Sequence, residues 1–142
     1  MKIASLLTGA AFCAAMAALP LASVTAHEGH DHGAAAPTAA NATEAWANAQ
    51  ASLKAIKAAV PTKDADTIHT EQEKLAASLK QVQEKGNAAD KARLDGAIKN
   101  AIAASERVHA AADAKDFGKV ESGLRTLEAT MQMVERNLAT EK

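Results

Sequence analysis

The stretch 117–138, FGKVESGLRTLEATMQMVERNL, decides the fold class of this 142-residue chain. Its large apolar residues recur at alternating steps of three and four, at Phe117, Val120, Leu124, Leu127, Met131, Val134 and Leu138. This spacing places them in one stripe along an α-helix, and such a stripe packs against a neighbouring helix with a left-handed coil. The stretch therefore predicts an amphipathic helix that buries one face.

Three earlier segments carry the same heptad-spaced stripe. Its members are Trp46, Ala49, Leu53, Ile56 and Val60 in the first segment; Ile68, Gln72, Leu75, Leu79 and Val82 in the second; and Leu94, Ile98, Ala101, Ser105, Val108 and Ala112 in the third. The connections between these segments are short, so consecutive helices must run antiparallel. We therefore predict an all-α domain over 41–142, an up-down-up-down antiparallel four-helix bundle.

Residues typical of helix ends separate these segments. Gly86 is expected to end the second helix in the left-handed conformation that favours glycine. Asn, Asp and Thr side chains accept hydrogen bonds from the first amides of a helix, and acids in the first turn suit the helix dipole. The expected N-caps are Asn41, Thr62, Asn87 and Asp113.

The N-terminus has the pattern of an export signal. Lys2 supplies a positive charge, residues 3–19 form an apolar run that is short for a membrane span, and Val24-Thr25-Ala26 offers small residues for cleavage. We expect residues 1–26 to be removed, leaving a periplasmic protein without stable membrane insertion. Cys13 is the only cysteine of the chain and lies in this signal, so the mature protein would have no disulfide.

Cleavage after Ala26 would leave a histidine-rich N-terminus. His27, His30 and His32 fall within six positions, together with Glu28 and Asp31. Imidazole suits copper, zinc and nickel, and the new amine of His27 is a further nitrogen donor. We predict that this cluster binds a divalent metal, on a flexible His-rich tail over 27–40. The alternative is a solvated polar tract with incidental metal binding.

The segment His27–Gly33 resembles the His/Asp/Glu segments of proteins in bacterial heavy-metal efflux and resistance systems. The resemblance implies a small periplasmic accessory protein, a buffer or carrier for copper, zinc or nickel. Its partners would be the metal ion and an envelope efflux or metal-handling protein. The main alternative is a helical interaction or adaptor module of the cell envelope.

Several other functions are disfavoured. The formal net charge of −1 gives no electrostatic case for nucleic acid. The first helix has no methionine and the last no histidine for haem, and the mature chain lacks a Cys-x-x-Cys-His motif. A di-iron site would need a further acid at the matching level of the first helix. No nucleophile with its base is recognisable, so we expect neither an enzyme nor haem.

His69 and His109 form a second candidate metal site within the bundle. Each follows a residue of the apolar stripe, so each is expected at the half-exposed edge of a helix interface. Two heptad-compatible registers exist for the second and third helices. One sets the two histidines opposite each other, and the other separates them by about 7 Å of axial rise. A tight turn at Gly86-Asn87 favours the second register.

Overall fold

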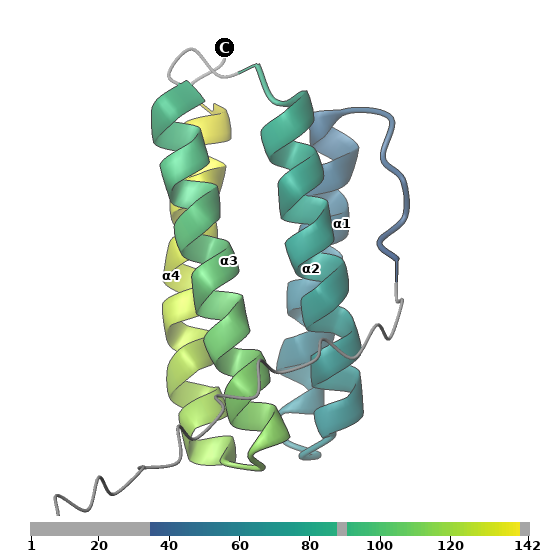
Figure 1. Ribbon diagram of the computed structural model, residues 1–142, viewed down its shortest axis with the longest axis vertical. Coiled ribbons are helices and arrows are strands. Elements are labelled where there is room, and N and C mark those ends of the chain that lie inside the picture. The colour runs from purple at the N-terminus through teal and green to yellow at the C-terminus, as the bar shows by residue number, and fades with distance from the viewer. Residues whose placement is uncertain (1–34, 88–90, 140–142) are drawn as a thin grey trace, which may run out of the picture. The chain divides into compact units, whose positions relative to one another are not determined.

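The computed structural model describes residues 35–87 and 91–139, and these form four α-helices without a β-strand (Figure 1). The helices are α1 (Ala42–Ala59), α2 (Ala65–Lys85), α3 (Lys91–Asp113) and α4 (Phe117–Ala139). Consecutive helices pack along one another in alternating directions. The predicted up-down-up-down four-helix bundle is confirmed.

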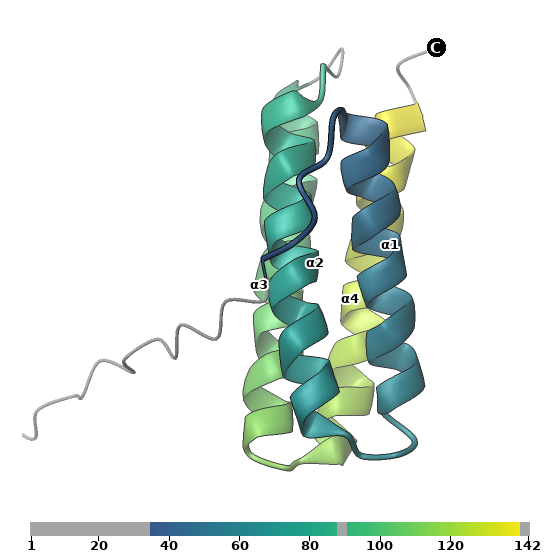
Figure 2. The same cartoon turned by 90° about the vertical axis from the view of Figure 1, so that its right-hand side faces the viewer.

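Polar contacts join the first helix to the last. Lys57 of α1 forms an ion pair with Glu128 of α4, and Gln50 Nε2 donates to Glu135 Oε1 at 3.4 Å. Figure 2 shows α1 and α4 side by side along their lengths. The four helices therefore enclose one core.

The predicted stripes line this core. Every stripe residue of α2 and α3 is buried, and in α4 Val120, Leu127, Met131 and Val134 are buried. In α1 the buried positions are Ala45, Ala49, Ser52, Ile56 and Ala59, while Trp46 and Leu53 are only partly buried. Three of the five buried positions of α1 therefore lie one residue before the predicted stripe positions.

The α1/α2 and α3/α4 connections, at the lower end of the bundle, have the same backbone conformation and the same closing hydrogen bond. Lys63 and Lys115 both have a φ of 55°, and each lies in the turn that follows the preceding helix. The next residue donates its amide to the carbonyl five positions back, at 3.1 Å from Asp64 to Ala59 and 2.9 Å from Asp116 to Ala111. These bonds satisfy carbonyls at the ends of α1 and α3.

These connections correct two of the expected N-caps. Asp64 Oδ1 accepts from the Thr67 amide at 3.0 Å, and Asp116 Oδ1 accepts from the Lys119 amide at 3.1 Å. The predicted caps Thr62 and Asp113 are wrong. Thr62 lies in the turn that follows α1, and Asp113 is the last residue of α3. The cap at Asn41 is confirmed, since its side chain accepts from the Glu44 amide at 2.9 Å.

Gly86 ends α2 but is not left-handed. Its φ of −71° and ψ of 136° are extended. A Cβ at this position would lie 2.7 Å from the Val82 carbonyl oxygen and 3.2 Å from Leu94 Cδ2. Glycine is therefore needed here chiefly because a Cβ would clash with a carbonyl oxygen of α2 itself, and to a lesser degree with Leu94 of α3. The predicted cap at Asn87 bears on residues 88–90, which lie outside the described residues.

The described end of the segment predicted to be flexible is held against α2. Ala39 is buried, and its amide donates to Gln81 Oε1 at 2.7 Å. Gln81 Nε2 donates in turn to the Pro37 carbonyl at 3.2 Å. Figure 2 shows this segment running beside α2. Within the described residues, no helix is both long and apolar enough to cross a membrane.

Candidate metal centre

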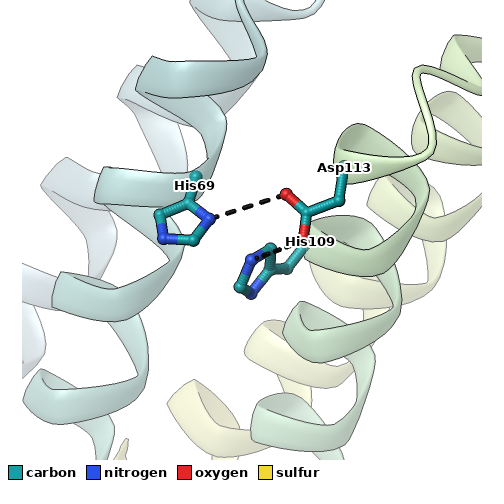
Figure 3. A group of neighbouring side chains, drawn as sticks. All are labelled: His69, His109 and Asp113. Carbon is teal, nitrogen blue, oxygen red and sulfur yellow. Dashed lines mark ion pairs between the residues drawn. The ribbon is translucent and has the colours of Figure 1, made fainter. Parts of the chain in front are cut away.

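His69 of α2 and His109 of α3 are in contact. Their ring centroids lie 4.2 Å apart and the ring planes meet at 84°, an edge-to-face arrangement. Figure 3 shows the two side chains facing each other across the α2/α3 interface. The register that we favoured from the sequence, which separates them by about five residues, is therefore wrong.

The length of the α2/α3 connection explains this correction. A tight turn at Gly86-Asn87 would have paired the helices around that point. Instead α2 ends at Lys85 and the described part of α3 begins at Lys91. Pairing around the longer connection shifts α3 relative to α2 by several residues, in the direction that brings His109 towards His69.

A buried polar pair matches this register. Gln72 Nε2 donates to Ser105 Oγ at 3.0 Å, and Ser105 Oγ donates to the Ile102 carbonyl at 2.8 Å. Gln72 is 4% exposed and Ser105 is 0% exposed. A heptad shift would separate these polar groups and leave them buried among apolar side chains, which is unfavourable. The Gln72–Ser105 pair therefore favours the register that joins the two histidines.

Asp113 completes a group of three possible metal ligands. Its Oδ2 lies 3.0 Å from His109 Nε2, and its Oδ1 lies 3.6 Å from His69 Nδ1. Asp113 is the last residue of α3, four positions after His109, so both side chains lie on one helix face. One carboxylate thus bridges two imidazoles from two helices.

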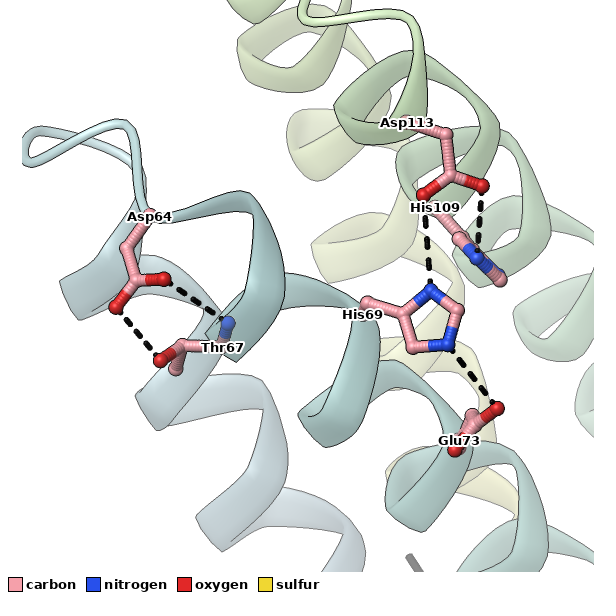
Figure 4. A network of polar contacts seen from close by, with 6 residues as sticks. All are labelled: Asp64, Thr67, His69, Glu73, His109 and Asp113. Carbon is pink, nitrogen blue, oxygen red and sulfur yellow. Dashed lines mark hydrogen bonds and ion pairs between the residues drawn. The ribbon is translucent and has the colours of Figure 1, made fainter. Parts of the chain in front are cut away.

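Glu73 contacts the other nitrogen of His69. Its Oε1 lies 3.3 Å from His69 Nε2, and it also follows its histidine by four positions (Figure 4). A carboxylate on the second nitrogen of an imidazole fixes the orientation and tautomer of the ring. His69 therefore lies between two acids, one on its own helix and one on α3.

The start of α2 places His69 in its second turn. Asp64 caps the helix and accepts from both the hydroxyl of Thr67, at 2.7 Å, and its amide (Figure 4). Both bonds lower the pKa of Asp64 from its usual value of 3.8, and the bond from the Thr67 hydroxyl has the larger effect. The capping carboxylate therefore stays ionised at neutral pH, where negative charge suits a helix N-terminus.

The cluster is partly open to solvent. The side chains of His69, His109 and Asp113 are 22%, 26% and 46% exposed. The Nε2 atoms of both rings are nevertheless covered. An ion could reach the cluster through the exposed carboxylate without disrupting the core.

The dimensions of the cluster fit a small divalent ion after modest adjustment. One ligand atom from each of His69, His109 and Asp113 lies within 4.8 Å of the other two. Ligands at 2.0–2.1 Å from a tetrahedral zinc ion are about 3.3 Å apart. The two contacts of Asp113, at 3.0 and 3.6 Å, are already close to that value. Because the ligand atoms lie within 4.8 Å of one another, the two ring nitrogens need to approach each other by at most about 1.5 Å to reach that value.

Sequence reasoning found the two histidines but missed both acids. We assigned Asp113 to a helix cap and did not consider Glu73. The available signal was an acid four residues after each histidine, repeated on two adjacent helices. Glu106 lies three residues before His109, at the Glu-x-x-His spacing of di-iron proteins, but it is not part of the cluster.

The predicted metal ligands of the tail are not placed by the structure. These five residues lie outside the described residues: His27, Glu28, His30, Asp31 and His32. Comparisons of the chain with protein-family models, with curated proteins and with solved structures found no match.

Proposed function

We propose that this chain is a metal-binding accessory protein of the bacterial cell envelope, a buffer or carrier for a divalent transition metal. The observation that carries the proposal is the convergence of His69, His109 and Asp113 from two helices. These three residues would be the ligands of the bundle. Glu73 would orient His69 through its second nitrogen.

The donor set favours copper, zinc or nickel. Two imidazoles and one carboxylate are borderline ligands that suit these ions, whereas calcium and magnesium prefer oxygen donors alone. Three protein ligands leave a coordination position for water or for a donor from another molecule. An open position and a partly exposed carboxylate suit a protein that must release its ion.

The N-terminal sequence supports the location and a second set of ligands. A signal over 1–26 would deliver the protein to the periplasm, and cleavage would place His27 at the mature N-terminus. His30 and His32, with Glu28 and Asp31, would then provide a capture site on the tail. The bundle would hold a second ion, or the same ion after transfer.

Calorimetry with zinc and copper(II) on the exported protein tests the bundle site. The first variant removes the tail ligands by changing His27, His30 and His32 to Ala, and the second carries His69→Ala with His109→Ala. We expect the tail variant to retain one site per chain. A variant that combines the tail changes with His69→Ala and His109→Ala should retain none. If the tail variant binds neither ion, the bundle is not a metal site.

Two single substitutions in the tail-variant background resolve the roles of the acids. Asp113→Asn should weaken zinc binding strongly, because it removes a charged ligand. Glu73→Ala should weaken zinc binding by about tenfold, the size of effect that an orienting partner has. Glu106→Gln is the matched control, since Glu106 is an exposed acid on α3 outside the cluster. Equal affinities for Asp113→Asn and Glu106→Gln would contradict the ligand assignment.

A further inference from the structure

Nothing in the described part of the bundle requires a glycine at position 96. It is an exposed residue inside α3, where glycine is less favourable than alanine. A Cβ at Gly96 would meet nothing within 4 Å. By contrast, a Cβ at Gly123 would lie 3.2 Å from Val108 Cγ2, so the packing of α3 against α4 accounts for that glycine. A helical glycine with open space around it leaves α3 accessible to the close approach of another backbone.

Gly96 lies between two shallow grooves. The first, of about 460 Å³, runs between α3 and α4, and the second, of about 360 Å³, between α2 and α3. Figure 1 shows α3 flanked by these two helices. Met133, a large hydrophobic residue that is 36% exposed, lines the first groove, and Ile102 lines the second. Both grooves and Gly96 together form one surface, which we call the Gly96 face.

The Gly96 face is positively charged although the chain as a whole is not. Four basic side chains line its grooves, and Asp95 is the one acid among the lining residues. Asp95 also forms an ion pair with Lys91 at 3.2 Å, which offsets its charge. The basic residues are Lys80, Arg93, Lys99 and Arg136.

We propose that the Gly96 face docks an amphipathic α-helix of a partner protein that carries acidic side chains. The partner helix would cross α3 at Gly96, where the missing side chain lets the two backbones approach. Its apolar residues would contact Met133 and Ile102, and its acids would face the basic residues on both sides. Opposite charges across such an interface speed association and select the partner.

Docking on this face is compatible with an occupied metal cluster. Gly96 and His109 are on the same helix, about 20 Å apart along its axis. A helix bound at the Gly96 face would therefore leave Asp113 and the two histidines accessible. The proposal does not depend on metal binding, and each can fail without the other.

A display library of helical peptides with randomised surface positions is the probe. Selection on the full-length protein should enrich acidic helices with small residues at their centre. The affinity of an enriched peptide should fall at least tenfold with Gly96→Gln and with Lys99→Glu. The controls are Gly118→Gln, at an exposed glycine near the start of α4, and Arg107→Glu, at an exposed base further along α3.

Three results would overturn the proposal. The first is enrichment of basic and acidic helices alike. The second is equal peptide affinity for Gly96→Gln and Gly118→Gln. The third is self-association of the protein in sedimentation that Gly96→Gln abolishes, because the occupant would then be a second copy of this chain. Thermal unfolding of each variant separates a lost interface from a lost fold.

Discussion

Replacing Ser105 by alanine tests whether the buried polar pair stabilises the bundle in its observed register. The substitution removes the acceptor of the Gln72 Nε2 hydrogen bond, and Gln72 is only 4% exposed. A buried polar group left without a partner costs about 1–3 kcal/mol. Alanine has the better helix propensity and recovers roughly 0.5 kcal/mol of this loss. We therefore expect the free energy of unfolding to fall by about 0.5–2.5 kcal/mol.

Urea unfolding followed by circular dichroism measures this change. The matched control is Ser78→Ala, because Ser78 is 1% exposed and its hydroxyl has no hydrogen-bond partner within the described chain. The same chemical change should there be neutral or stabilising, since it removes a buried polar group that already lacks a partner. If Ser105→Ala destabilises the protein no more than Ser78→Ala, the Gln72–Ser105 bond contributes nothing and the reasoning fails.

A double variant separates stability from register. Gln72→Leu combined with Ser105→Ala replaces both polar groups by apolar ones, which is often nearly neutral or stabilising. The free energy of unfolding should then return close to that of the unchanged protein. Zinc affinity of the bundle site should fall, because the two heptad-compatible registers would no longer be distinguished by a polar pair. Unchanged zinc affinity would show that packing and the length of the α2/α3 connection set the register without the polar pair.

Gly96→Ala should raise the free energy of unfolding by about 1 kcal/mol in urea, and a decrease would contradict the open space around its Cβ position. Gly86→Ala should destabilise the protein in the same assay, because the new Cβ would lie 2.7 Å from the Val82 carbonyl oxygen. Hydrogen bonds lower the pKa of Asp64 and Asp116 from 3.8, so the folded state binds their protons more weakly than the unfolded state. Their contribution to stability is therefore present above about pH 4 and lost as the pH falls below it. Unfolding curves measured over a series of pH values check this, and changing both residues to Asn should weaken the dependence of the free energy of unfolding on pH. Chelator treatment should leave the helical circular dichroism signal unchanged, whereas its collapse would make the metal structural.

The fold class could be predicted from the sequence because heptad spacing is a local property of each segment. The stripe of α2 from Ile68 to Val82 and that of α3 from Leu94 to Ala112 needed no tertiary information. The cap at Asn41 was equally local, since its partner is three residues away. The burial of Met131 and the exposure of Met133 also follow from their positions relative to the stripe.

The metal cluster depended on how two helices align, which heptad spacing alone leaves undecided. Shifting α3 by seven residues keeps apolar residues facing apolar residues, so the pattern is the same in both registers. The length of the connection between Lys85 and Lys91 and the buried bond between Gln72 and Ser105 distinguish them. The sequence by itself therefore determined the helices, their stripes and the half-exposed edge positions of His69 and His109. Only the tertiary structure decided that the two rings meet, because contacts between residues forty positions apart depend on register and not on local periodicity.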